Sequence, residues 1–146
     1  MKKIILDSSV IVKWLNRDNE EHLKQADKIL QDLQSGKITV FSPELAKYEI
    51  GNALLKKGLN PHQAFHSLGT VYGLPIQFVP ETENLSSKTY DSAYEVKFHK
   101  DKKFTYYDAS FIALAKQEKA ILVTDNPKHQ RQKVSEVKVV HLEDYH

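Results

Sequence analysis

Short apolar runs alternate with longer amphipathic stretches along this chain. The short runs have the length expected of strands, and they cover residues 4–6, 38–41, 76–79, 121–124 and 137–142. The longer stretches repeat apolar residues at the spacing of one helix face, over residues 9–15, 21–34, 43–57, 61–72, 84–98 and 106–118. Strands that alternate with helices predict an α/β fold in which helices cover both faces of a parallel sheet.

The five predicted strands differ in how apolar they are. Residues 4–6 and 121–123 are unbroken apolar runs, as expected for strands that are buried on both faces. The other three contain polar residues, so we expect them at the periphery and place the first and fourth strands at the sheet centre. Where the connections of such a sheet reverse direction, a crevice forms beyond the carboxyl ends of the strands. Asp7 and Asp125 follow these two strands and would point into that crevice.

Three sites carry the residue pattern of a helix start. Ser42 followed by Pro43, and Asn60 followed by Pro61, each place a capping residue before a proline at the first helical position. Thr105 and Asp108 have the spacing of a capping residue and the third residue of its helix. We therefore expect helices to begin at all three sites.

Composition narrows the classes of protein that fit. A chain of 146 residues fits one domain, residues 1–146, and its 40% hydrophobic and 27% charged residues are ordinary for a globular protein. The absence of cysteine excludes a disulfide framework and a thiolate metal site, and it fits a reducing cytoplasm. No stretch reaches the roughly 20 apolar residues of a membrane span, and the apolar run at the N-terminus is too short for a signal peptide. The net charge of +2 does not by itself indicate nucleic-acid binding.

Three aspartates occupy positions that a carboxylate-lined site would need, and each also has a structural explanation. Asp7 could cap the helix that starts near Ser9. Asp108 would be stabilised in a first helical turn by about 0.3–1 kcal/mol. Asp125 belongs to an Asp-Asn-Pro turn. Two neighbours of Asp125 add neutral oxygen atoms that could orient a water or a ligand, namely Thr124 and Asn126.

Glu49 is harder to explain by structure alone. It lies inside a predicted helix and borders apolar residues, so its carboxylate needs a partner, either a metal ion or a lysine from elsewhere in the fold. Together with the three aspartates it would line one rim of the sheet. Clustered carboxylates raise one another's pKa unless a cation is present, and a set of oxygen ligands suits Mg²⁺ or Mn²⁺.

Four segments carry a resemblance to a known family, and they cover residues 5–13, 44–54, 107–115 and 122–126. In order and spacing they resemble the PIN-domain family, most closely its small members, the VapC-type toxin ribonucleases of type II toxin–antitoxin systems. The resemblance implies a three-layer α/β/α sandwich with a five-stranded parallel sheet, and a metal-dependent endoribonuclease. It also implies a homodimer and a cognate antitoxin protein. It assigns the acidic quartet to Asp7, Glu49, Asp108 and Asp125, with Asp7 and Asp108 as principal metal contacts and Ser9 as a hydroxyl near the first acid.

The expected function is therefore hydrolysis of RNA phosphodiester bonds with Mg²⁺ or Mn²⁺. One or two ions would bind Asp7, Asp108 and Asp125, while Glu49 would bind through water or deprotonate the attacking water. Two alternatives remain open: a catalytically silent RNA-binding or assembly module of the same fold, and a phosphatase or phospho-acceptor domain.

Residues that could contact RNA surround the expected site. Basic side chains near the rim could contact phosphates, although a solvated charged face is the alternative for each; they are Lys13, Arg17, Lys47, Lys128 and Arg131. Residues 99–103 form a basic cluster that we expect to be a loop. Tyr106 and Tyr107 could stack on bases, with core packing as the alternative.

Overall fold

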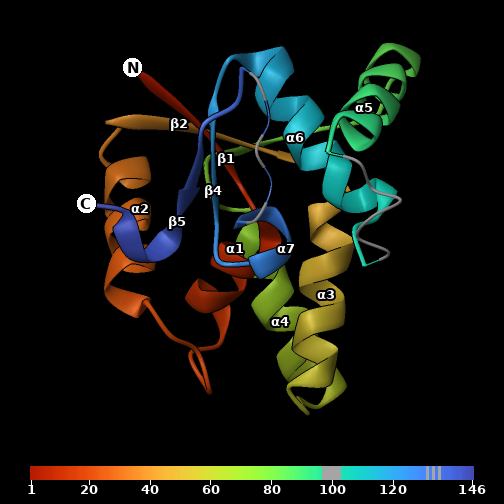
Figure 1. The fold of residues 1–146 in the computed structure, drawn as a ribbon. Helices are drawn as coiled ribbons and strands as arrows, with labels where there is room; N and C mark the ends of the chain where they lie inside the picture. Colours follow the sequence, from red (N-terminus) through yellow and green to blue (C-terminus); the bar gives the residue numbers. More distant parts are fainter. Residues whose placement is uncertain (97–102, 131, 133, 135) are drawn as a thin grey trace.

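The computed structural model describes residues 1–96, 103–130, 132, 134 and 136–146. Its centre is a parallel sheet of five strands in the order β3-β2-β1-β4-β5 (Figure 1). The strands are β1 (Lys2–Leu6), β2 (Ile38–Pro43), β3 (Ile76–Val79), β4 (Ile121–Thr124) and β5 (Val139–His141). Five parallel strands between two helical layers confirm the predicted α/β/α sandwich.

The helices form two layers, one on each face of the sheet. They are α1 (Ser8–Leu15), α2 (Leu23–Gln34), α3 (Ala46–Lys56), α4 (Pro61–Val71), α5 (Glu83–Glu95), α6 (Tyr106–Glu118), α7 (Pro127–Gln130) and the 3₁₀ helix η2 (Leu142–Asp144). Helices α1 to α4 share one apolar cluster with the sheet, and α5 and α6 share the other. Figure 1 accordingly shows α2 and the α5–α6 pair on opposite sides of the sheet.

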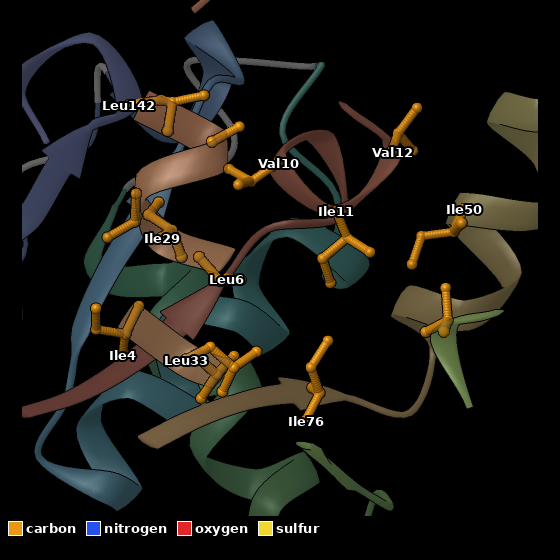
Figure 2. Close-up of a cluster of buried hydrophobic side chains, with 14 of the residues drawn as sticks. Ile4, Leu6, Val10, Ile11, Val12, Ile29, Leu33, Ile50, Ile76 and Leu142 are labelled. Carbon is orange, nitrogen blue, oxygen red and sulfur yellow. The ribbon is translucent and has the colours of Figure 1, made fainter. Parts of the chain in front are cut away.

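Alternation along the strands sends neighbouring side chains into different clusters. Ile4 and Leu6 of β1 pack in the first cluster, whereas Ile5 between them packs in the second. Figure 2 shows the first cluster, in which side chains of β1, α1 and α2 meet Ile50 of α3 and Leu142 of η2. Because β1 is buried on both faces, its carboxyl end is held in a fixed position.

The strand order confirms one expectation about the sheet and corrects another. β1 and β4 are neighbours in the interior, and the connections reverse direction between them, as predicted. β3 and β5 form the edges, but β2 is an interior strand, so its predicted peripheral position was wrong. The polar Thr39 misled the prediction, because it is only half-buried near the start of a strand whose other residues are buried.

Two of the three predicted helix starts are confirmed, and one is corrected. Thr105 and Asn60 each form a capping box, with Asp108 and Gln63 respectively, so these two starts are confirmed. Pro43 is instead the last residue of β2, and α3 begins at Ala46. The predicted extension of α5 to residue 98 lies outside the described residues.

The Ser42 hydroxyl explains the corrected start, because it donates a hydrogen bond across the sheet to the carbonyl of Leu6 instead of capping a helix. As a result, Glu49 lies in the first turn of α3 and not in its middle.

Within the described part of the chain, no helix is both long and apolar enough to cross a membrane.

Candidate metal centre

Two buried aspartates mark the centre of the site. Asp7 directly follows β1 and is 3% exposed, while Asp108 lies in the first turn of α6 and is 4% exposed. Asp125 directly follows β4, which is the neighbour of β1, so Asp125 lies at the same edge of the sheet as Asp7. A parallel sheet brings the carboxyl ends of its strands together at such a reversal point, which is why residues distant in sequence converge here.

The imidazole of His129 lies between the two buried aspartates. Its Nδ1 atom is 3.1 Å from Oδ2 of Asp7, and its Nε2 atom is 3.3 Å from Oδ1 of Asp108. The ring is 1% exposed and packs against Phe111 and Phe104, at centroid distances of 5.5 and 6.4 Å. Neither ring nitrogen forms a hydrogen bond with a described residue, so the two contacts are ion-pair contacts.

These contacts shift the pKa values of all three groups. Burial alone would lower the pKa of His129, but the two carboxylates outweigh it and raise that pKa to about 9. Burial alone would raise the pKa of Asp108, but His129, the Thr105 backbone amide and Lys128 lower it to about 2. The pKa of Asp7 is likewise lowered, because the contacts with His129, Thr124 and Ser8 outweigh its burial. The side chains of His129, Asp7 and Asp108 are therefore all charged at neutral pH.

Asp7 is also held by two hydroxyl groups. Thr124 donates a hydrogen bond of 2.6 Å to its Oδ2 atom, and the Ser8 hydroxyl lies 3.2 Å from Oδ1. Ser8, rather than the expected Ser9, is thus the hydroxyl next to the first acid. The difference is one of helix rotation, since the side chains of adjacent residues point about 100° apart on α1.

The Asp108 carboxylate caps the start of α6 and also contacts two cationic side chains of the site. Its Oδ2 atom accepts hydrogen bonds from the backbone N–H and the hydroxyl of Thr105, at 2.9 and 3.0 Å. The same atom lies 3.0 Å from Nζ of Lys128. Its Oδ1 atom faces His129. The capping box fixes the carboxylate, so that its orientation toward the other acids comes from the local sequence of α6.

Glu49 joins the site through Ser8. The Ser8 hydroxyl lies 2.9 Å from Oε1 of Glu49 and 3.2 Å from Asp7, so it bridges the two carboxylates. Burial, together with the negative charges of Asp7 and Asp108, raises the pKa of Glu49. Among the described residues no lysine forms an ion pair with Glu49, so the structure gives no support to the lysine alternative there.

Asp125 lies at the margin and is already paired. Its carboxylate is 2.8 Å from Nζ of Lys13 and 3.1 Å from Nδ1 of His22. Its backbone N–H donates to the Ser9 hydroxyl at 3.2 Å, which ties the end of β4 to the start of α1. Lys13 is 3% exposed and also pairs with Glu20, so its ammonium group is buried between carboxylates, which does not support its predicted contact with RNA phosphates.

The other predicted RNA contacts lie in different surroundings. Arg17 forms a two-pronged pair with Asp27 at the surface. Lys47 pairs with Glu44 at 2.9 Å and lies over the ring of Tyr72. Arg131 and most of the basic cluster, residues 99–102, lie outside the described residues. Of the four basic side chains that the structure describes, Lys128 is the one that lies beside a buried aspartate.

His129 is a buried residue of the site that the sequence analysis missed. Asn126 donates its backbone N–H to the Thr124 hydroxyl, and its side chain accepts the N–H of Lys128. These bonds turn the chain into the short helix α7, which directs His129 inward. A four-residue helix shows no periodicity, so the available signal was a histidine four residues after the acid of an Asp-Asn-Pro turn.

The donor chemistry of the site fits a hard divalent cation. Asp7, Asp108, Glu49 and Asp125 offer only oxygen ligands, and the two aspartates are buried and fixed by hydroxyl groups. In the described structure Asp7 and Asp108 contact His129, Glu49 contacts Ser8, and Asp125 contacts Lys13 and His22. The one described group of three whose ligand atoms lie within 4.8 Å of each other is His141, Glu143 and Asp144, at the surface of the C-terminal segment.

Fold and site together define an α/β protein with buried acids at the reversal point of a parallel sheet. The PIN domain profile matches residues 4–134. This chain belongs to the PIN-domain family.

Solved structures of toxin–antitoxin proteins share the fold. VapBC2 from Rickettsia felis, bound to a promoter DNA fragment, is 18% identical with a TM-score of 0.65, over 95% of this chain and 98% of that one. VapC20 from Mycobacterium tuberculosis, described as a sarcin-ricin loop cleaving toxin, is 14% identical with a TM-score of 0.66, over 92% and 98%. FitAcB from Neisseria gonorrhoeae is 19% identical with a TM-score of 0.65, over 97% and 99%. No curated protein matches the chain.

Proposed function

We propose that this protein is a metal-dependent endoribonuclease, the toxin component of a toxin–antitoxin pair. One observation carries the proposal: two buried carboxylates, Asp7 and Asp108, face each other across a single imidazole, with Glu49 joined to Asp7 through Ser8. Carboxylates buried side by side are costly unless a cation neutralises them. Clustered acids with shifted pKa values are typical of functional sites, and the pKa values of Asp7, Asp108 and Glu49 are all shifted.

The acids would hold Mg²⁺ or Mn²⁺, with Asp7 and Asp108 as principal ligands and Asp125 and Glu49 completing the set. Such an ion, when bound, stabilises developing negative charge on a phosphoryl group and lowers the pKa of a water molecule. Its charge would take over the neutralisation that His129 and Lys128 provide in the described structure.

The chain's own residues would supply proton transfer and positioning. Glu49 is suited to remove a proton, because its raised pKa makes it a stronger base than an ordinary carboxylate. Ser8 holds Glu49 beside Asp7 by its hydrogen bond. Thr124 and Asn126 fix the turn after β4, and Lys128, whose side chain is 30% exposed, is placed to contact a phosphate. Cleavage would release the 3′-oxygen and leave a 5′-phosphate.

The similar structures support an antitoxin partner for this protein. VapC20 is described as a sarcin-ricin loop cleaving toxin, and the VapBC2 structure is bound to a promoter DNA fragment. A solved toxin–antitoxin complex from Klebsiella pneumoniae has a TM-score of 0.62 to this chain. We infer for this protein an RNA substrate, a cognate antitoxin, a homodimer and a cytoplasmic location.

A catalytically silent RNA-binding module is the second candidate. It is favoured by one observation: His129 and Lys128 already neutralise the two central aspartates without any added ion. Such a module would bind RNA without cutting it, and its binding would survive Asp7→Asn.

Cleavage of a mixed, end-labelled RNA pool tests the proposal. The purified protein would be incubated with Mg²⁺, with Mn²⁺ and with EDTA, beside Asp7→Asn, Asp108→Asn and the control Asp91→Asn on the exposed face of α5. We expect cutting that requires the metal, disappears in the first two variants and persists in the control. Binding without cutting by the folded, metal-loaded protein would favour the second candidate. Cutting that survives both substitutions would remove the site assignment.

A further inference from the structure

An open depression lies directly beside Glu49. It has a volume of about 400 Å³ and is lined by Leu45, Tyr48, Glu49, Asn52 and Tyr107. Two of its walls are the immediate sequence neighbours of site acids, since Tyr48 precedes Glu49 and Tyr107 precedes Asp108. A molecule in this depression would therefore lie next to the acids.

The two tyrosines present their rings to solvent. Tyr48 is 80% exposed and Tyr107 is 60% exposed, although aromatic side chains ordinarily bury most of their surface. Other residues form the buried faces of α3 and α6, so the packing of these helices does not explain why the two rings are exposed. Exposed rings that flank one depression are suited to bind a flat, apolar face.

The Tyr107 wall is held in place from behind. Its ring meets Tyr106 edge to face, at a centroid distance of 6.4 Å and an interplanar angle of 83°. Tyr106 packs in turn on Tyr90 at 5.0 Å, and its hydroxyl donates a hydrogen bond to Glu81. A ring supported in this way loses little freedom when a ligand binds, which favours affinity.

The other residues that line the depression include one side chain that can form hydrogen bonds with a ligand. Asn52 lies one helical turn after Tyr48 on α3, and its amide offers both a donor and an acceptor. Leu45 contributes an apolar surface on the other side of Tyr48. A flat π-face bounded by hydrogen-bonding edges is the chemistry of a nucleobase, and in a duplex both faces of a base are covered by its neighbours.

We propose that this depression binds one unpaired nucleobase of the RNA, which stacks on Tyr107 and Tyr48 while Asn52 contacts its edge. The inference rests on the proposed function and extends it: the substrate is single-stranded next to the scissile phosphate, and the tyrosines position that phosphate at the acids. Tyr48, Asn52 and Tyr107 are then residues that determine specificity, not residues of the chemical step.

Abasic scanning of a labelled RNA tests the subsite. A fluorescein-labelled single-stranded 12-mer would be compared with versions that each lack one base, by anisotropy in an Asp108→Asn background that leaves the RNA uncut. Removing a stacked base should weaken binding about 5- to 150-fold at one position. In Tyr48→Leu and Tyr107→Leu we expect the intact RNA to lose affinity and that position to stop mattering. Tyr107→Phe keeps the ring and should keep the affinity.

Phe65→Leu provides the matched control, because Phe65 is 77% exposed on α4 and does not line the depression. An equal loss in this control, equal binding of double-stranded RNA, or no RNA binding by the parent protein would each overturn the inference. Unchanged RNA affinity in the tyrosine variants would also overturn the inference. If light scattering then showed a changed oligomeric state in these variants, the depression would be a protein interface. Failure of the otherwise wild-type protein to cut RNA with Mg²⁺ would instead count against the proposed function, and the anisotropy result would still decide the subsite.

Discussion

The Nδ1 atom of His129 lies 3.1 Å from Oδ2 of Asp7, and both side chains are almost completely buried. The other ring nitrogen faces Asp108 at 3.3 Å, so one imidazolium connects the two acids on which the site depends. Removing one partner of a buried ion pair is strongly destabilising, because the remaining charge has no compensation. His129 therefore contributes measurably to the free energy of unfolding when no divalent cation is bound.

Replacing His129 by glutamine should destabilise the protein in EDTA by about 3 kcal/mol. The loss should be smaller in saturating Mg²⁺, because a bound cation would neutralise the same carboxylates. Urea unfolding in the two buffers measures both values. His66→Gln, at an exposed position of α4, is the control and should change neither. An equal loss in both buffers would show that the histidine and the ion do not share these acids.

The stability of the metal-free protein should fall as the pH rises from about 6.5 to about 9. The pKa of His129 is raised from 6.5 to about 9 in the folded state, so folding favours its protonated form. That stabilisation is complete below the unfolded pKa and is lost as the pH passes the folded one. Urea unfolding in EDTA at several pH values would show the slope, and His129→Gln should lack it. A parent protein with the same pH dependence as the variant would contradict the charged pairing.

Asp125→Asn should reduce RNA cleavage less than Asp7→Asn does. Asp125 completes the proposed ligand set from the margin of the site, where it is already paired with Lys13 and His22, so we expect a loss of about 10- to 100-fold, as for residues outside the principal ligands. Asp7→Asn should abolish cleavage. Lys13→Met should resemble Asp125→Asn, since it removes the group that fixes this carboxylate. Initial rates at saturating Mg²⁺ compare the three, and equal losses in both aspartate variants would place Asp125 among the principal ligands.

Tyr145→Phe should destabilise the protein by about 1.5–3 kcal/mol. The Tyr145 hydroxyl donates a hydrogen bond of 2.9 Å to Asp32, which is buried on α2, and the ring packs in the first apolar cluster. Phenylalanine keeps the packing and leaves one oxygen of the carboxylate without its donor. Thermal unfolding monitored by circular dichroism measures the effect. Tyr72→Phe, at an exposed ring, should leave the transition unchanged.

Much of the fold was predictable because local pattern and tertiary structure agree. The bounds of β3, β4 and α6 match the sequence prediction to the residue. The unbroken apolar runs at β1 and β4 correctly indicated interior strands, and this placed Asp7 and Asp125 at one edge.

Three features could not be predicted, because they depend on contacts between distant segments. Ser42 and Pro43 have the residue types of a helix start, but the Ser42 hydroxyl bonds to β1 and the strand continues. The choice of Ser8 over Ser9 as the hydroxyl next to Asp7 depends on how α1 is rotated. His129 belongs to a helix too short to show a pattern, and only the fold places it between two acids.

Mn²⁺ binding measured by isothermal titration calorimetry tests the central claim most directly, namely that the acids around Asp7 and Asp108 form the cation site. The comparison needs the parent protein, Asp108→Asn, and Asp144→Asn in the surface group with His141 and Glu143. We predict that binding is lost in Asp108→Asn and kept in Asp144→Asn. Binding that survives Asp108→Asn and disappears in Asp144→Asn would contradict the account.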